Sequence, residues 1–240
     1  MTDKKKPIFY TELSYILGLI ILALGTALME WGDFGMSMVV APAYLLHLKL
    51  SQFWPVFTFG MAEYMTQAVV LVLLALVMKK FKPIYLFSFV TAVLYGVLLD
   101  VAIHVVSAMP LDQWLAALGG QGGLVLRVVV YSFGMVIATL SIAMLFQTYI
   151  APEAYELFVK ELSEKTHQDI GKVKTIYDCV SCIVAILLSF VFFGFGHFEG
   201  IKIGTILTTI VNGTMISFWG KMLYKVFRFE DALSFRKYFQ

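Results

Sequence analysis

The amino-acid sequence predicts an all-α membrane protein with six transmembrane helices arranged as two inverted three-helix repeats. Hydrophobic residues make up 60% of the 240-residue chain and charged residues only 14%, whereas soluble domains average about 45–50% apolar and about 25% charged residues. Several apolar runs are long enough to cross a bilayer, which takes roughly 20 residues per helix. The basic residues collect in alternate connections, and short matches relate the two halves of the chain.

The apolar runs define six predicted spans. They are residues 13–29, 55–78, 83–106, 124–150, 176–195 and 203–223. A further apolar run over 36–48 is too short to cross and contains Pro42. Runs of about 10–14 residues are typical of re-entrant or interfacial segments. We therefore expect a short helix after the first span, over 36–50, and another after the fourth, over 151–165, and both interpretations remain open for each.

The lysines and arginines indicate the orientation. With the N-terminus inside, 15 of the 18 basic residues fall on the cytoplasmic side, and only Lys49, Arg127 and Lys202 fall outside. This asymmetry follows the positive-inside rule. A seventh span at 36–48 would move the basic cluster of residues 79–82 outside. We therefore expect a multi-pass protein with both termini in the cytoplasm.

Short matches indicate an internal repeat. Ser88 and Thr205 each stand eight residues before a glycine, near the start of the third predicted span of their half. The sequence Ala-Pro-Ala-Tyr at 41–44 has a counterpart in Ala-Pro-Glu-Ala-Tyr at 151–155. Glu63 and Asp178 each follow the start of a middle helix.

The predicted halves are residues 1–118 and 119–240, joined by a flexible glycine-rich linker at 119–123. Three spans per half is an odd number, so the second half enters the membrane from the opposite face. Inverted repeats of this kind build many secondary transporters, whose binding sites lie near the midplane beside interrupted helices.

The first half resembles the bacterial YitT/YczE-type membrane proteins. Gly25 followed by Gly-Asp-Phe-Gly-Met-Ser at 32–37 is similar to their Asp-Leu-Gly-Val-Ser turn, and Gly-Thr-Ile at 204–206 to their Gly-Thr signature. Where that family usually has Pro-Trp, this chain has Met38-Val39. The resemblance implies a small, transport-related protein of the bacterial inner membrane whose family has no settled substrate.

Polar groups inside apolar spans are costly, so each is a candidate functional residue. The predicted substrate-binding residues are Glu63, Tyr64, Asp100, Asp178 and Asn212. Carboxylates beside aromatic rings suit a cation or a proton as the passenger. Asp100 and His104, spaced i, i+4, are the predicted proton relay, and a satisfied structural pair is the alternative. We expect Arg127 to reach outward or to pair with Asp100.

A soft-metal site is a second hypothesis. Its ligands would be Met36, Met38, Cys179 and Cys182. Thioethers and thiolates suit Cu(I). Methionine is also common filler in apolar helices, so the solute-transporter hypothesis ranks above this one.

The remaining motifs narrow the class of function. No nucleophile, zincin or phosphate-loop motif is present, which argues against an enzyme and gives no reason to expect a cofactor. A net charge of +2 does not provide the basic surface that nucleic-acid binding requires.

The predicted partners are the lipid bilayer and a small-molecule or ion substrate, and a homo-oligomer is left open. The leading hypothesis is a secondary or facilitative transporter of a small solute. The alternatives are a substrate-binding membrane subunit of an ATP-driven importer and a non-transporting scaffold.

Overall fold

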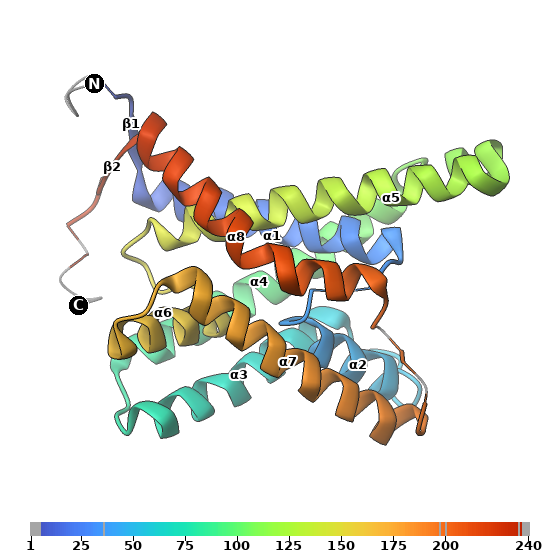
Figure 1. The fold of residues 1–240 in the computed structure, drawn as a ribbon, viewed down its shortest axis with the longest axis horizontal. Coiled ribbons are helices and arrows are strands. Elements are labelled where there is room, and N and C mark those ends of the chain that lie inside the picture. The colour runs from blue at the N-terminus through green and yellow to red at the C-terminus, as the bar shows by residue number, and fades with distance from the viewer. Residues whose placement is uncertain (1–5, 36, 197, 200, 235, 237–240) are drawn as a thin grey trace.

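A computed structural model describes residues 6–35, 37–196, 198–199, 201–234 and 236. Eight helices and two short strands account for most of this part of the chain (Figure 1). The helices are α1 (Thr11–Gly32), α2 (Ala41–Leu50), α3 (Phe59–Met78), α4 (Pro83–Ala108), α5 (Leu111–Phe146), α6 (Ala154–Thr166), α7 (Ile170–Phe193) and α8 (Ile203–Val226). The strands β1 (Ile8–Tyr10) and β2 (Arg228–Glu230) pair in parallel and join the two ends of the chain.

Five of these helices are long and apolar enough to cross a membrane, within the described residues: α1, α3, α4, α5 and α7. The protein is therefore an all-helical, multi-pass membrane protein by length and composition. The sixth predicted span coincides with α8, which is long enough but less apolar. Thr205, Thr208, Thr209 and Asn212 lie on α8 and lower its hydropathy. A count of six spans stays a prediction.

Local sequence accounts for several helix boundaries. The Thr58 hydroxyl caps the start of α3 by accepting from the Met61 backbone N–H at 3.1 Å. Asp169 caps α7 in the same way, accepting from the Gly171 and Lys172 N–H groups. Pro83 stands in the first turn of α4, where its missing N–H costs nothing. Such caps satisfy donors that a helix end leaves without a partner.

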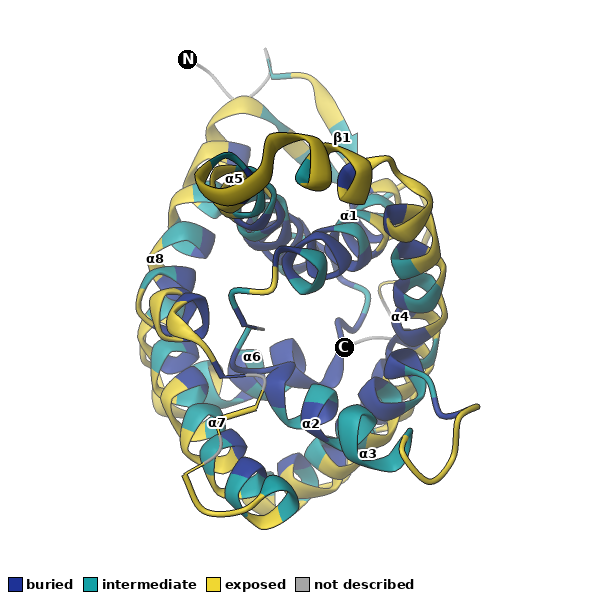
Figure 2. Ribbon diagram, turned by 90° about the vertical axis from the view of Figure 1, so that its right-hand side faces the viewer, coloured by how far each residue is buried: buried dark blue, intermediate teal, exposed yellow. Residues whose placement is uncertain are grey.

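The helices form an oval ring whose buried faces point inward and whose exposed faces point outward (Figure 2). α1 packs against both α5 and α4, α5 packs against α8, α3 packs against α4, and α7 packs against α8. The short helices α2 and α6 each contact both α3 and α7. The two short helices thus bridge two long helices that belong to different halves of the chain.

Glycines allow two of these helix pairs to approach closely. A Cβ on Gly96 of α4 would lie 2.7 Å from the Gly60 carbonyl oxygen of α3. A Cβ on Gly213 of α8 would lie 2.7 Å from the Gly171 carbonyl oxygen of α7. Small residues at such crossings let helices in a membrane pack backbone against backbone.

The glycine-rich segment at 119–123, which we predicted as a flexible linker, contains a turn between two helical segments of α5. Gly119 and Gly120 depart from helical φ/ψ values. Both have positive φ, a conformation that glycine adopts without a steric penalty. The chain turns back at these glycines, since a Cβ on Gly123 would lie 3.5 Å from the Leu115 carbonyl oxygen.

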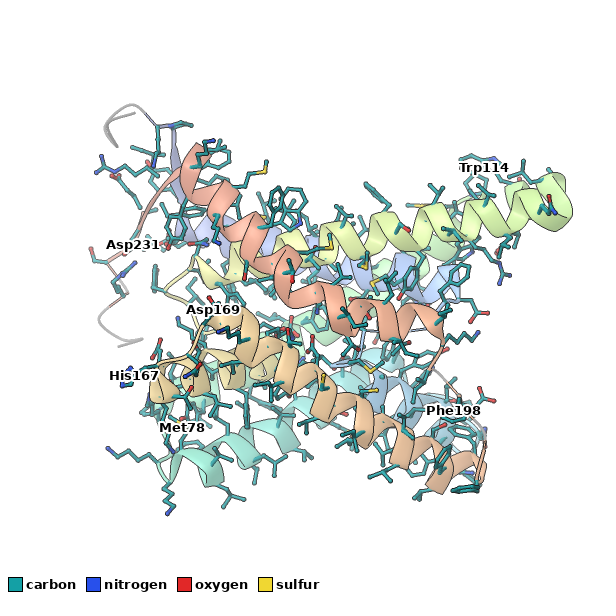
Figure 3. The ribbon with its side chains drawn as sticks, in the orientation of Figure 1. Met78, Trp114, His167, Asp169, Phe198 and Asp231 are labelled. Carbon is teal, nitrogen blue, oxygen red and sulfur yellow. The ribbon has the colours of Figure 1, made fainter. Side chains whose placement is uncertain are left out.

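Different segments of the chain lie at the two ends of the ring (Figures 1 and 3). The strands β1 and β2 lie at one end, together with Met78, His167 and Asp169, where α3 meets α4 and α6 meets α7. Trp114 and Phe198 lie at the opposite end.

Candidate functional site: a buried carboxylate cluster

Five charged side chains are enclosed in the described part of the ring, each between 0% and 3% exposed. They are Glu63 of α3, Glu153 and Glu156 at the start of α6, and Lys174 and Asp178 of α7. We call these five residues the central cluster. Four carboxyl groups face one ammonium group, so the ionised cluster would carry excess negative charge.

The α3 side of the central cluster holds the start of α6. The Tyr155 hydroxyl donates to Glu63 Oε2 at 2.8 Å. One turn further along α3, Gln67 Nε2 donates to Glu153 Oε2 at 2.9 Å, and Gln67 Oε1 accepts from the Ala154 N–H at 3.0 Å. These three bonds fix the first turn of α6 against α3.

The α7 side contains the only positive charge of the central cluster. Lys174 Nζ lies 3.3 Å from Asp178 Oδ1 and 3.5 Å from Glu156 Oε1. Asn212 of α8 donates from Nδ2 to Asp178 Oδ2 at 3.3 Å. Lys174 thus balances part of the negative charge of Asp178 and Glu156. Glu63 and Glu153 bond instead to the neutral side chains of Tyr155 and Gln67.

Hydroxyl groups on α4 hold the segment that leads into α6. Ser88 donates to the Pro152 carbonyl at 2.6 Å, and Thr91 donates to the Ala151 carbonyl at 3.0 Å. Pro152 prevents a continuous helix here, so nearby backbone carbonyls lack the helical N–H that would normally bond to them. A buried carbonyl of this kind needs another hydrogen-bond donor. The hydroxyls of α4 therefore make an interrupted backbone tolerable inside the ring.

Four carboxylate oxygens of the central cluster have no hydrogen bond among the described residues. Asp178 Oδ1 has its ion pair with Lys174 instead. The other three, Glu63 Oε1, Glu153 Oε1 and Glu156 Oε2, are the unpaired oxygens of the cluster. Buried polar atoms are almost always paired. A buried acceptor without a hydrogen bond destabilises the fold more when it belongs to an ionised carboxylate than when it belongs to a neutral group. These oxygens are therefore positioned for a proton, a cation or a donor group from a ligand.

A cavity of about 40 Å³ adjoins the central cluster. Glu153, Glu156 and Lys174 line it on one side, and Val39 and Val40, which precede α2, line it on another. A volume of about 10–15 Å³ on this measure holds one water. The cavity has room for a few waters and for nothing larger in this conformation.

The structure brings three of the predicted binding residues together. Glu63, Asp178 and Asn212 all belong to or touch the central cluster. Tyr64 lies elsewhere, half-buried beside Gly96 at the crossing of α3 and α4.

The predicted relay residues lie away from the central cluster. Asp100 accepts from the Thr58 hydroxyl at 2.7 Å and from the Gly60 N–H at 2.9 Å, at the start of α3. His104 is exposed, and the described part of the chain contains no hydrogen bond between it and Asp100. Of the two alternatives for Arg127, pairing with Asp100 is wrong: Arg127 is partly exposed and pairs with Asp33 at 3.6 Å.

The residues of the soft-metal hypothesis differ in their exposure to solvent. Met38 is buried, Cys179 is exposed, and Cys182 is half-buried, with both thiols free. Met36 lies outside the described residues. No group of three His, Cys, Asp or Glu residues that could hold a metal occurs among the residues that the structure describes.

Sequence reasoning missed Lys174, Glu153 and Glu156. Lys174 was counted with the cytoplasmic basic residues, because the fifth span was predicted to begin at 176, whereas α7 begins at Ile170. In the sequence of 151–165, Tyr155, Phe158 and Leu162 share a face that excludes Glu156, which predicts an exposed Glu156, yet Glu156 is buried. One signal was present in the sequence: Lys174 and Asp178 are spaced i, i+4, as an intrahelical ion pair requires.

A family model matches residues 9–221 of this chain, and its description is a family of unknown function, DUF6198. The chain belongs to the DUF6198 family. No curated protein and no solved structure matches it. The resemblance to the YitT/YczE-type proteins stays a prediction.

Proposed function

We propose that this DUF6198 chain is a secondary or facilitative transporter of a small, positively charged solute or of protons. The observation that carries the proposal is the central cluster, with four buried carboxyl groups, one ammonium group and three unpaired oxygens. Ionisable groups at membrane depth are expensive, and they usually mark a substrate or ion pathway. Excess carboxylate favours a positive passenger.

The packing of the helices supports two inverted repeats. Exchanging α1 to α4 with α5 to α8 maps each principal contact onto another: α1–α4 onto α5–α8, α3–α4 onto α7–α8, and α2–α7 onto α3–α6. The same exchange maps the glycine crossing of α3 and α4 onto that of α7 and α8. In this proposal α8 is the sixth span.

The glycine crossings also revise which residues correspond. Glu63 lies three residues after Gly60, and Lys174 lies three residues after Gly171. The equivalent of Glu63 is therefore Lys174, and Asp178 is the equivalent of Gln67, not of Glu63. Equivalent positions in the two halves thus carry opposite charges on the two sides of α6.

In this proposal α2 and α6 are re-entrant helices. The residues before α2 and the first turn of α6 line the same cavity. Helices that begin at the midplane direct their N-terminal dipoles and free backbone groups toward a substrate. Such a site can be exposed alternately to the two faces when one half moves against the other.

Separate cavities lie on the two sides of the central one. A cavity of about 60 Å³ at the end of α1 contains Glu30, Asp33 and Glu199, and it shares Met29 with the central cavity. A larger cavity of about 640 Å³ lies near Lys82 and Tyr149, and it shares no lining residue with the central cavity. This arrangement suits a carrier in which each side opens in turn.

The proposed orientation places both chain ends in the cytoplasm of a bacterial cell, with the protein in the inner membrane. The support is that the connection between α3 and α4, with Lys79, Lys80 and Lys82, lies at the same end of the ring as β1 and β2. Basic connections favour the cytoplasmic side.

Flux into proteoliposomes tests the proposal. The purified chain should take up methylammonium, or move protons down an imposed gradient, above the rate of empty liposomes. Glu63→Gln should reduce this flux at least tenfold, because it removes a carboxylate of the central cluster that bonds to Tyr155, a residue lining the cavity. Asp112→Asn is the control, since Asp112 is an exposed carboxylate at the start of α5 that lines none of these three cavities.

Two outcomes would contradict the proposal. One is wild-type flux equal to that of empty liposomes for both probes, and the other is undiminished flux in Glu63→Gln. Flux by the isolated chain would also argue against a subunit that depends on an ATPase partner.

A further inference from the structure

An apolar groove of about 600 Å³ lies on the outer surface between α3 and α7. Val69 and Leu73 of α3 form one wall, and Val180 and Val184 of α7 form the other. α2 and α6 lie between these two helices, as their contacts with both show (Figure 2). Both walls belong to helices that could cross a membrane, so the groove faces hydrocarbon.

The floor of the groove sets it apart from an ordinary lipid-facing surface. Tyr155 and Val39 line both the groove and the central cavity. The Tyr155 hydroxyl bonds to Glu63 at 2.8 Å. A hydrocarbon chain in the groove is therefore separated from a buried carboxylate by a single side chain.

Two further aromatic rings continue this floor. Phe158 and Tyr177 also line the groove, and their ring centroids lie 5.3 Å apart. The Tyr177 ring lies 5.7 Å from Lys174 Nζ, so it already receives one ammonium group on the inner side. We call Tyr155, Phe158 and Tyr177 the aromatic floor.

We propose that the groove is a lateral portal for an amphipathic organic cation, which deepens the proposed function and rests on it. The alkyl chain lies between α3 and α7, and the ammonium head meets the aromatic floor, where the Tyr155 hydroxyl bonds to the Glu63 carboxylate behind it. Aromatic faces attract ammonium groups, most strongly where water is excluded. The central cavity, at about 40 Å³, receives at most the head group, so the chain stays in the groove.

Binding of two alkylammonium probes to the full chain in lipid nanodiscs tests the proposal, with empty nanodiscs as the reference. Methylammonium probes the head-group site alone, and decylammonium probes the head-group site together with the groove. Val180→Trp fills the groove from α7. Ile183→Trp is the matched control, because Ile183 is equally apolar and exposed on α7 but does not line the groove.

We expect Val180→Trp to weaken decylammonium binding at least tenfold and to leave methylammonium binding unchanged. Ile183→Trp should change neither, and Glu63→Gln should weaken both. Equal effects of the two tryptophan variants on decylammonium, or no effect of Val180→Trp, would overturn the portal while the proposed function stands. Decylammonium binding that survives Glu63→Gln would show a plain alkyl-chain site, which also contradicts the portal.

The oligomeric state supplies one further outcome. If Val180→Trp converts a dimer into a monomer and leaves decylammonium binding intact, the groove is an interface between copies, and the portal is wrong. If Glu63→Gln changes neither methylammonium binding nor flux, the proposed function fails on its own measurement.

Discussion

The two short helices occupy comparable places in the ring but carry opposite chemistry. The start of α2 is apolar, and Val39, Val40, Ala41, Ala43 and Leu45 are all buried there. The start of α6 buries Glu153 and Glu156, and Glu161 follows further along. Each short helix contacts both α3 and α7. The same scaffold position therefore supplies a passive wall in one half and ionisable groups in the other.

This difference shows that a repeated backbone does not require a repeated site. Close packing of the ring depends on small residues at crossings, which recur in both halves. Charges impose a stronger condition, because each buried charge needs a partner. Lys174 meets that condition for Glu156 and Asp178, and a second cluster on α2 would need its own counter-charge.

The largest effect on stability should come from removing the only ammonium group of the central cluster. Lys174→Met leaves Glu156 and Asp178 without a counter-charge, and breaking a buried pair in this way costs about 3–5 kcal/mol. Thermal unfolding of the purified protein measures the loss. The double variant Lys174→Met/Asp178→Asn should recover part of the stability, and a single variant as stable as the wild type would contradict the assigned pairing.

An apolar truncation on α2 should destabilise the protein by a comparable amount through a different cause. Leu45 is fully buried, and Leu→Ala at such sites costs about 2–5 kcal/mol because a cavity remains. Unlike the cluster variants, Leu45→Ala should leave methylammonium affinity unchanged when it is measured below the melting temperature. A large loss of affinity would show that α2 is more than a wall.

The sequence predicted the helices better than the site. Long apolar runs located the spans to within a few residues, except at the start of α5 and of α7. The error of six residues at α7 was enough to place Lys174 outside the membrane. Burial of Glu156 could not be predicted either, because an amphipathic pattern does not reveal that α6 lies inside a ring. The i, i+4 pair of Asp100 and His104 satisfied the spacing rule, but Asp100 instead accepts hydrogen bonds at the start of α3.

A smaller effect should appear in the pH dependence of stability. Burial, followed by the nearby carboxylates of Glu156 and Glu63, raises the pKa of Glu153, which lies in the connection between α5 and α6. Gln67 and Lys174 also face Glu153 and oppose this rise. A carboxyl group with a raised folded-state pKa stabilises the fold below its unfolded pKa of about 4.5, and this contribution is lost as pH rises through the folded value.

Glu153→Gln should therefore reduce the loss of stability between acidic and neutral pH, because the amide mimics the protonated acid at every pH. Melting temperatures of both proteins across this range measure the difference. An unchanged slope would mean that Glu153 is ionised throughout, with its charge balanced by Lys174.

The smallest effect separates a capping carboxylate from a transporting one. Asp100 accepts from Thr58 and Gly60, and it does not line the central cavity. Asp100→Asn keeps one acceptor oxygen, so we expect a cost of about 1 kcal/mol, typical of a weakened cap, and no change in flux. Stability and flux of the same preparation measure both. A fall in flux as large as that of Glu63→Gln would show that Asp100 takes part in transport. The transport pathway would then include charged residues away from α6. In that case the difference between α2 and α6 would no longer identify the transport site.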